Sequence, residues 1–333
     1  MTDRERLMRE WLDVVLPAAP ARMAPASSDA SFRRYFRIWG DDGQTRIVMD
    51  APPEQEDCRP FVAIAQALRD LGLNAPEVLA GDLDWGLLLL TDLGSRQYLA
   101  ELDARSAPAL YGDALDALAR LQLGGDPGSP LLPPYDSALL HREMDLFRSW
   151  FLGCLLGLEL REEEHQTLDH AFALLADNAL EQPRVWVHRD YHSRNLMVTD
   201  PDNPGVLDFQ DAVVGAVTYD LVSLLRDCYI AWPRARVAGW ALDHRARLRA
   251  GGMSGLDDAE QFLRWFDLMG VQRHLKAIGI FTRLNLRDGK PGYLRDIPRT
   301  LGYVLEATDR YPELAGLREL LLTRDVVHWR PVS

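Results

Sequence analysis

Two patterns of apolar and polar positions divide the chain. In the first part, short runs rich in apolar, aromatic and β-branched residues predict strands, because such side chains pack well on a pleated sheet. In the second part, apolar residues recur every three or four positions, which predicts helices that each bury one face. The expected strands are 32–39, 46–50, 75–79 and 86–90, with helices over 4–16 and 60–71. Further helices are expected over 107–123, 141–158, 167–178, 219–225, 253–282 and 295–311.

This order of elements predicts an α+β protein with a small β-rich N-terminal lobe and a larger, mostly helical C-terminal lobe. The continuous apolar run at 86–90 reads as a buried strand, and it stops abruptly at 91–94. We interpret 91–94 as a hinge, so the expected domains are 1–94 and 95–333. A plain strand-to-helix turn is the alternative interpretation of the same residues.

One stretch, 185–211, interrupts the helical part with short strands expected at 185–187, 196–198 and 206–207. A loop between the first two of these strands holds Asp190 and Asn195, and Asp208 ends the third. The turn at 200–205 contains two prolines and a glycine, which favours a hairpin. Such a hairpin would return Asp208 towards the loop.

These three residues suit the transfer of a phosphoryl group. The side-chain oxygens of Asn195 and Asp208 are ligands that Mg²⁺ prefers, and Asp190 could take the proton of an incoming hydroxyl. The spacing His188-Arg189-Asp190, then Asn195, then Asp208, matches the catalytic loop and metal-binding aspartate of kinases. Asp and Asn also cap turns routinely, but three such residues at this spacing favour a phosphotransferase site.

Composition narrows the class of protein. The 333 residues are 47% hydrophobic, which is ample for a large core, and the net charge of -13 argues against a nucleic-acid-binding surface. Three widely spaced cysteines, Cys58, Cys154 and Cys228, predict neither a disulfide framework nor a zinc cluster. No apolar run is long enough to span a bilayer and none follows the charged N-terminus, so we expect a cytoplasmic protein without a membrane partner.

On these motifs the chain resembles the aminoglycoside phosphotransferase/choline kinase family, which has a bilobal protein-kinase-like fold. The resemblance implies ATP and Mg²⁺ as cofactors, a nucleotide-binding lobe at 1–94, and a lobe at 95–333 with the catalytic loop and the substrate site. It implies Asp190 as the catalytic base and Asn195 and Asp208 as Mg²⁺ ligands. His188 would support the loop, and Asp220 would either cap the helix 219–225 or hold the loop backbone from below.

The nucleotide contacts are harder to assign from sequence. The small residues at 27–31, including Ser28 and Ser31, could face phosphate oxygens through their backbone, or could form an ordinary surface turn. The backbone around Leu90 and Asp92 could bind an adenine edge. Kinases place a lysine on the third strand, but no lysine precedes Lys276 here, so Arg33, Arg34 or Arg46 would have to hold the phosphates.

The acceptor follows from a narrower resemblance. The stretches SFRRYFRI, MDAPPE, HRDYHSRNLM, GVLDFQDA and QRHLKAIGIF are similar to the bacterial anomeric N-acetylmuramate/N-acetylglucosamine kinases of cell-wall recycling. This implies a sugar 1-kinase with a small-molecule sugar as its substrate. We expect a monomer, since no protein partner is implied. Three arginines, Arg194, Arg226 and Arg273, are candidates for the lactyl carboxylate of N-acetylmuramate, although each could equally be a surface or helix-end arginine.

Two alternative functions remain open at this point. Another small alcohol, such as choline, homoserine or an aminoglycoside, could be the acceptor. A nucleotide-binding protein without catalysis is the alternative from another class, because the usual lysine is missing. A protein kinase is disfavoured, since no activation-segment motif follows Asp208.

Overall fold

The structure is a computed structural model that describes residues 3–28 and 32–331. By its internal contacts the chain divides into two compact units. The first unit contains residues 1–101 together with 195–210, and the second contains 102–194 together with 211–333. Each unit is described in turn.

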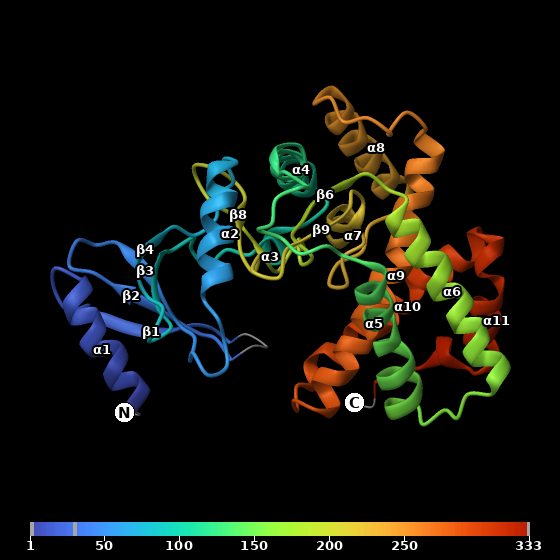
Figure 1. Ribbon diagram of the computed structural model, residues 1–333, viewed down its shortest axis with the longest axis horizontal. Coiled ribbons are helices and arrows are strands. Elements are labelled where there is room, and N and C mark those ends of the chain that lie inside the picture. Colours follow the sequence, from blue (N-terminus) through green and yellow to red (C-terminus); the bar gives the residue numbers. More distant parts are fainter. Residues whose placement is uncertain (1–2, 29–31, 332–333) are drawn as a thin grey trace. The chain divides into compact units, whose positions relative to one another are not determined.

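A five-stranded antiparallel sheet forms the framework of the first unit (Figure 1). Its strand order is β1-β2-β3-β5-β4. The last strand in the sequence, β5, contains the buried leucines and lies between β3 and β4. The strands are β1 (Arg22–Ser28), β2 (Arg34–Trp39), β3 (Thr45–Asp50), β4 (Val78–Asp82) and β5 (Leu87–Thr91). The expected strands are therefore confirmed to within a few residues at their ends.

Two helices pack on this sheet because each has one apolar face. Helix α1 (Asp3–Val15) buries Met8, Trp11 and Leu12 against side chains of β2, β3 and β5. Helix α2 (Arg59–Asp70) buries Phe61, Ile64, Ala65 and Leu68, the face that the sequence pattern indicates. Figure 1 shows α1 and α2 on different sides of the sheet. A short helix, α3 (Tyr98–Glu101), follows β5 and ends the first chain segment of this unit.

Strand β1 corrects one expectation from the sequence. Ser27 and Ser28 belong to this edge strand and pair with β2, whereas the sequence suggested that a loop or turn over 27–31 begins there. The register shifts between Pro25 and Ser27, which is how a strand at the edge of a sheet accommodates a proline. Any loop before β2 is therefore confined to 29–33, and of these residues 29–31 lie outside the described part of the chain.

The hairpin from the catalytic stretch belongs to the first unit. Strands β7 (Leu196–Met197) and β8 (Gly205–Val206) pair antiparallel, which confirms the hairpin expected from the turn at 200–205. Asn74 fixes it to the sheet region, because its side-chain amide donates to Thr199 Oγ1 at 3.2 Å and to the carbonyl of Asp202 at 2.9 Å. Phe209 packs against Phe61 of α2 with a ring-centre distance of 4.9 Å.

The second unit is mostly helical, and it contains one two-stranded ribbon of β6 (Arg184–Val187) and β9 (Val213–Ala216). Its larger helices are α4 (Ala107–Gly124), α5 (Ser137–Leu146), α6 (Glu162–Leu180), α7 (Tyr219–Leu225), α8 (Arg234–Ala250), α9 (Ala259–Leu286), α10 (Ile297–Arg310) and α11 (Ala315–Thr323). Shorter helical pieces are η1 (Phe147–Leu155), η2 (Pro291–Asp296), η3 (Pro312–Leu314) and η4 (Val326–His328).

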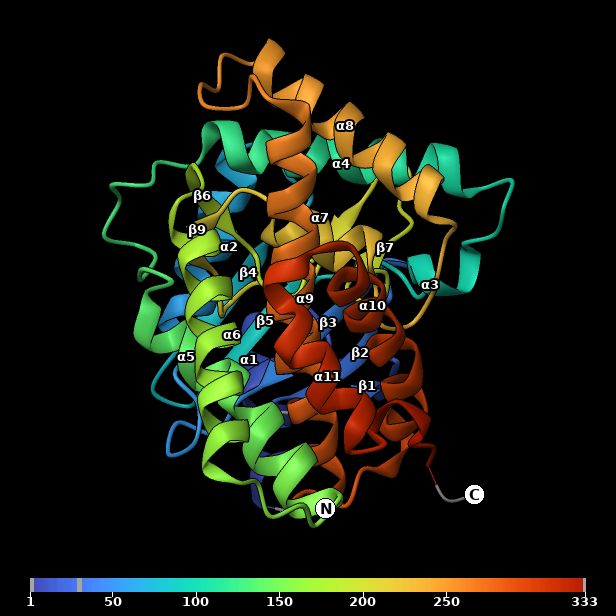
Figure 2. The same ribbon diagram turned by 90° about the vertical axis from the view of Figure 1, so that its right-hand side faces the viewer.

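Helix α9 is the central element of this unit (Figure 2). It packs against α5, η1, α6, α7 and α10, so nearly every side of its middle is buried. Gly279 makes one of these contacts possible, since a Cβ there would lie 2.4 Å from the carbonyl carbon of Leu146. Because α9 is enclosed, its polar side chains Gln272, Arg273 and Lys276 are also buried.

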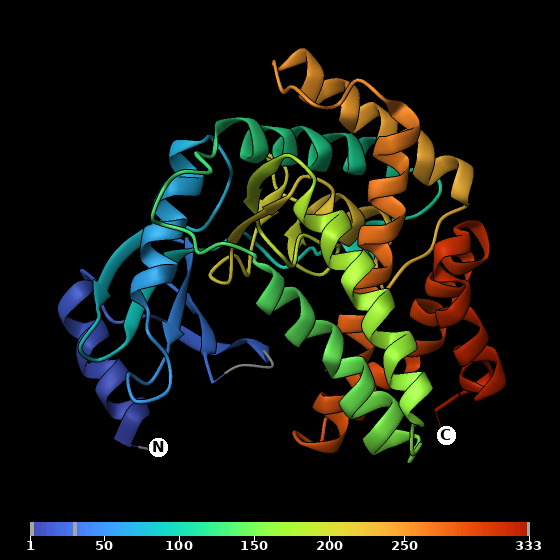
Figure 3. The same cartoon turned by 45° about the vertical axis from the view of Figure 1, so that its right-hand side comes forward.

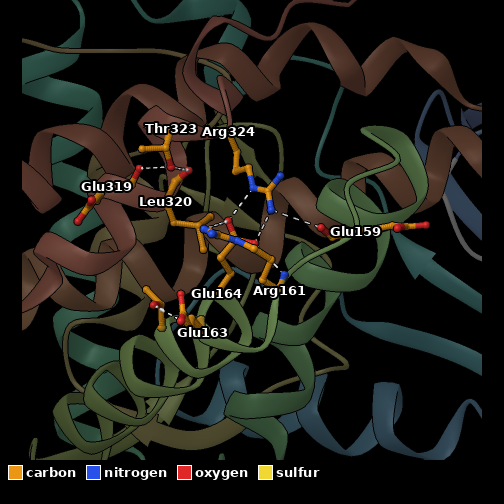
Figure 4. Close-up of polar contacts among 9 residues, drawn as sticks. Glu159, Arg161, Glu163, Glu164, Glu319, Leu320, Thr323 and Arg324 are labelled. Atoms are coloured by element: carbon orange, nitrogen blue, oxygen red, sulfur yellow. Dashed lines mark hydrogen bonds and ion pairs between the residues drawn. The ribbon is translucent and has the colours of Figure 1, made fainter.

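Two further contacts hold the helices in place. Helices α4 and α8 lie side by side, and a buried hydrogen bond of 2.9 Å joins His244 Nε2 of α8 to Gln122 Oε1 of α4 (Figure 3). At the other contact, Arg324 donates from Nε to Glu164 Oε1 at 2.6 Å, and Glu164 also accepts the backbone N–H of Arg161 (Figure 4). This second contact ties the start of α6 to the end of α11.

The architecture confirms the expected fold class, with a five-stranded sheet followed by a mostly helical part. Within residues 3–28 and 32–331, no helix is both long enough and apolar enough to span a bilayer.

Candidate active site

Asp220 holds the backbone at the start of the loop 188–195, the predicted catalytic loop. Its buried carboxylate accepts the N–H of His188 at 2.6 Å and that of Arg189 at 2.9 Å. Asp220 does not cap α7, because it is the second residue of the helix and Thr218 occupies the cap position. Burial raises the pKa of Asp220 to about 7, against the opposing effect of the two backbone donors.

Arg189 has an unusual backbone conformation. Its φ is +75°, in the left-handed region that favours glycine. Glycine would adopt this conformation without the steric cost that the Cβ of arginine brings. The strain is balanced by contacts of the side chain, which ion-pairs with Glu143, donates to the carbonyl of Asp211 at 3.2 Å and lies over the ring of Tyr135.

Glu143 connects this arginine to α9. Lys276 Nζ lies 3.2 Å from Glu143 Oε1 and 2.9 Å from the hydroxyl of Tyr219, and the hydroxyl of Tyr135 donates to the same carboxylate. Glu143 and Lys276 are both more than nine-tenths buried. Burial alone would raise the pKa of Glu143, but the neighbouring Lys276 and Arg189 lower it, so the carboxylate stays ionised. The network is thus a buried set of paired charges next to the loop.

Asp190 follows Arg189 and carries the proposed chemistry. Burial would raise its pKa, yet the positive field of Lys276, His192 and Arg273 outweighs that effect and lowers the pKa to about 2. Asp190 is therefore an anion at any pH where the protein would work. The backbone carbonyl of Asp190 accepts the N–H of His192 at 2.9 Å, which keeps the loop tightly turned.

A second carboxylate, Asp227, fixes the end of the loop. It accepts the backbone N–H of Ser193 at 3.0 Å and the hydroxyl of the same residue, and its other oxygen accepts the N–H of Tyr229 at 2.9 Å. The segment before Asn195 is therefore bonded to the segment after α7. Ser193, Asp227 and Tyr229 all belong to the second unit.

The two expected metal ligands lie together in the first unit. Asn195 Nδ2 donates to Asp208 Oδ2 at 3.1 Å, and Gln210 Nε2 donates to Asp208 Oδ1 at 2.8 Å. Asp208 has a φ of +64°, a strained conformation typical of functional positions. The pair supplies amide and carboxylate oxygens, which fits a hard divalent cation.

This oxygen pair is a small ligand set. Among the described residues no group of three or more His, Cys, Asp or Glu could hold a metal ion. Mg²⁺ commonly takes one or two carboxylates and completes its shell with water and substrate phosphates, so the pair fits Mg²⁺ delivered with a nucleotide better than a permanently bound metal. Asp190 lies in the other unit, and its action together with Asn195 and Asp208 remains a prediction.

The arginines near β2 each have a carboxylate partner. Arg33 donates to Glu56 at 2.9 Å in a largely buried pair, and Arg34 pairs with the fully buried Asp50, which also binds Arg4. Glu56 precedes α2 in the chain.

The other nucleotide candidates are placed as follows. Asp92 is bound through both carboxylate oxygens by Arg37, at 2.5 and 2.9 Å. Leu90 pairs with β3 on one side and with β4 on the other, so it lies inside the sheet. Ser28 ends β1, and Ser31 lies outside the described residues. Nucleotide contacts of these residues stay predictions.

The three candidate substrate arginines have different surroundings. Arg226 forms two hydrogen bonds to Glu306, at 2.8 and 2.9 Å. Arg273 is buried and has one nitrogen 3.9 Å from the sulfur of Cys228. Arg194 is half-buried, with its guanidinium 4.7 Å above the ring of Tyr229.

Sequence reasoning missed Glu143, Asp227 and Lys276. A signal existed for Lys276, because it is one of two lysines in the chain and lies in an apolar helix. Glu143 and Asp227 gave no comparable signal, since an isolated acidic residue in a helix or loop is usually solvated.

Comparison with known proteins identifies the family of the chain. The phosphotransferase enzyme family matches residues 22–263. The chain belongs to this family. A relative in Pseudomonas putida, named N-acetylmuramate/N-acetylglucosamine kinase, is 51% identical over 90% of this chain and 87% of its own. A relative of the same name in Pseudomonas aeruginosa is 50% identical, covering 93% and 94%.

A solved structure supports the fold of this family member. An aminoglycoside phosphotransferase with bound ADP superposes with a TM-score of 0.60 over 92% of this chain and 99% of that chain. Its sequence identity is 15%, so the likeness concerns the fold alone.

Proposed function

We propose that this phosphotransferase is an ATP-dependent sugar kinase that phosphorylates the anomeric 1-hydroxyl of N-acetylmuramate and N-acetylglucosamine. The observation that carries the proposal is the 51% identity, over nine-tenths of the chain, to a relative named for these two sugars. The anionic Asp190 on a firmly held loop supports it, because a kinase of this kind needs a base beside the acceptor hydroxyl.

Asp190 orients the sugar hydroxyl and takes its proton as the new bond forms between the sugar oxygen and the γ-phosphorus of ATP. The bond between the γ-phosphorus and the β-phosphate oxygen breaks in the same transfer, and ADP leaves. An anomeric hydroxyl is more acidic than other sugar hydroxyls, so a base of low pKa suffices for it. Asp190 is ionised before substrate binds, so no proton has to leave the site first. The positive charge of Lys276 and Arg273 keeps it in that state.

Asn195 and Asp208 present oxygens for Mg²⁺ on the nucleotide. When bound, the cation offsets negative charge on the phosphates during transfer. Asn195 and Gln210 each donate to an oxygen of Asp208, and these bonds orient the carboxylate. The hairpin of β7 and β8 joins the two residues through the backbone, since Leu207 N–H donates to Asn195 O at 2.9 Å.

Arg33 replaces the missing lysine in this proposal. Arg33 directly precedes β2 and forms an ion pair with Glu56. In protein kinases a glutamate of a helix forms the corresponding ion pair with the phosphate-binding lysine. A guanidinium is permanently charged and can bind phosphate through two N–H groups. Arg34 is the second candidate, since it lies next in the chain and its partner Asp50 ends β3.

The experiment that tests this function is a panel of acceptors with ATP and Mg²⁺. The panel contains N-acetylmuramate, N-acetylglucosamine, choline, homoserine and an aminoglycoside. We expect ATP consumption that depends on either amino sugar, with phosphorus–proton NMR coupling that places the phosphate on C1. Phosphorylation of choline, homoserine or the aminoglycoside instead would contradict the proposed acceptor. ATP binding without turnover on any acceptor would favour a non-catalytic nucleotide-binding protein.

A further inference from the structure

The guanidinium of Arg194 lies on an aromatic platform at the end of the catalytic loop. Its central carbon is 4.7 Å from the ring centre of Tyr229 and 5.5 Å from that of Tyr293. Phe281 supports the platform from α9, with its ring stacked on Tyr293 at 5.5 Å. Stacking of this kind holds an arginine in a defined orientation, with its N–H groups directed sideways from the ring faces.

The platform and the loop are fixed by the same carboxylate. Asp227 accepts N–H groups from Ser193, directly before Arg194, and from Tyr229, the ring beneath Arg194. The position of the guanidinium is therefore set from both sides before any ligand binds. A preorganised charged group binds its partner with less loss of side-chain freedom.

Arg194 lies four residues after Asp190, so the two Cα atoms are at most about 14 Å apart even in extended chain. A sugar whose 1-hydroxyl reaches Asp190 would have its other substituents within reach of a long side chain in the same loop. N-acetylmuramate differs from N-acetylglucosamine by a lactyl ether at C3, which ends in a carboxylate. A guanidinium can bind a carboxylate through two parallel N–H groups.

The three candidate arginines differ in how far they are buried. Arg194 itself interacts with the side chain of Tyr229 and with the charge of Asp296. Both terminal nitrogens of Arg226 are bound to Glu306, and its side chain is 8% exposed. Arg273 is 5% exposed and contributes to the positive field on Asp190. Arg194 is half-buried, so part of its surface remains accessible.

We propose that Arg194, held on Tyr229 and Tyr293, binds the lactyl carboxylate of N-acetylmuramate and sets the preference between the two sugars. This inference rests on the proposed function and adds the residue that recognises the acidic substrate. Acceptance of the neutral sugar follows from the same geometry, because N-acetylglucosamine has no group that must pair with the arginine.

The test compares kcat and KM for both sugars in the full-length protein and three variants. Arg194→Gln should raise KM for N-acetylmuramate about 10- to 100-fold, the usual loss for a charged hydrogen bond, and should change KM for N-acetylglucosamine less than about twofold. Arg194→Lys should have a KM for N-acetylmuramate between those of the wild type and Arg194→Gln, because an ammonium group keeps the charge but lacks the bidentate fork. Arg295→Gln removes an equally charged, 81% exposed side chain from η2, and it should leave both sugars unaffected.

Three results would overturn the inference. One is an equal rise in KM for both sugars in Arg194→Gln, which would mean that the arginine stabilises the loop and does not recognise the lactyl carboxylate. Another is an unchanged KM for N-acetylmuramate. The third is a wild-type protein that phosphorylates neither sugar, and this result alone would also overturn the proposed function.

Discussion

Arg189 ion-pairs with Glu143 across the second unit, although its own backbone is in a left-handed conformation. The side-chain contact compensates for backbone strain at the residue directly before Asp190, the proposed base. This arrangement separates two contributions to stability that can be measured independently.

The backbone contribution is tested by comparing Arg189→Gly with Arg189→Ala. Both variants lose the ion pair with Glu143, but only alanine has a Cβ that opposes a φ of +75°. We expect Arg189→Ala to be less stable than Arg189→Gly by about 1 kcal/mol in urea unfolding, despite the greater flexibility of glycine in the unfolded chain. An alanine variant as stable as the glycine variant would show that this residue is not strained.

Lys276 is expected to control the protonation of Asp190. It is the first of the cations that lower the pKa of Asp190 against the effect of burial. Lys276→Met should raise that pKa, so the acid limb of the kcat profile should move towards neutral pH by about one unit or more. Lys276→Arg keeps the charge and should retain the wild-type profile. Because the pKa of Asp190 is about 2 in the wild type, the profiles must be followed down to about pH 2.5, with circular dichroism showing that both proteins stay folded. Coincident acid limbs of the methionine variant and the wild type in that range would remove Lys276 from this role.

Nucleotide affinity should depend on the arginines near β2 to different degrees. Arg33→Gln should raise KM for ATP about tenfold or more with a smaller change in KM for the sugar, because a phosphate-binding charge is lost. Arg59→Gln is the matched control, since Arg59 is 77% exposed and pairs with Asp57 at the start of α2. Initial rates at varied ATP would distinguish them. If Arg34→Gln alone raises KM for ATP, Arg34 takes the role proposed for Arg33.

Acid should destabilise the contact between α4 and α8. Burial lowers the pKa of His244 to about 3, so the folded protein keeps this histidine neutral while the unfolded chain binds a proton below its ordinary pKa of 6.5. The stability from this difference is present above pH 6.5 and is lost as pH falls. We expect the wild type to lose about 1.4 kcal/mol more than His244→Gln between pH 7.5 and 5.5.

Urea unfolding at the two pH values measures this difference, because other titrating groups cancel between the two proteins. His170→Gln, which changes an exposed histidine of α6, should behave like the wild type. Equal pH dependence in His244→Gln and the wild type would mean that His244 does not titrate differently on folding.

Much of the fold could be predicted because it follows local patterns. The apolar face of α2 and the buried strand β5 are visible in the spacing of their residues. Strand β1 was missed because an edge strand with a proline and small side chains lacks a strand's apolar signal. Helix α8 was not expected either. It is rich in arginine, and its few buried positions, among them Val237 and Leu248, give only a weak helical periodicity of apolar residues.

The site was predictable only where its residues are close in sequence. Asp190, Asn195 and Asp208 lie within one stretch with a defined spacing. Glu143 and Lys276 come from α5 and α9, and only the packed helices bring them to Arg189. No spacing rule connects residues so far apart in the chain, and an isolated buried charge cannot be told from a solvated one by composition.

The central claim is that Asp190 is the base for phosphoryl transfer, and single-turnover kinetics of Asp190→Asn with MgATP and N-acetylglucosamine tests it most directly. The account predicts nucleotide affinity close to that of the wild type and transfer slower by about two to four decades. Asp200→Asn, an exposed carboxylate in the turn between β7 and β8, should transfer phosphate at the wild-type rate. Transfer by Asp190→Asn at a rate near that of the wild type would contradict the account.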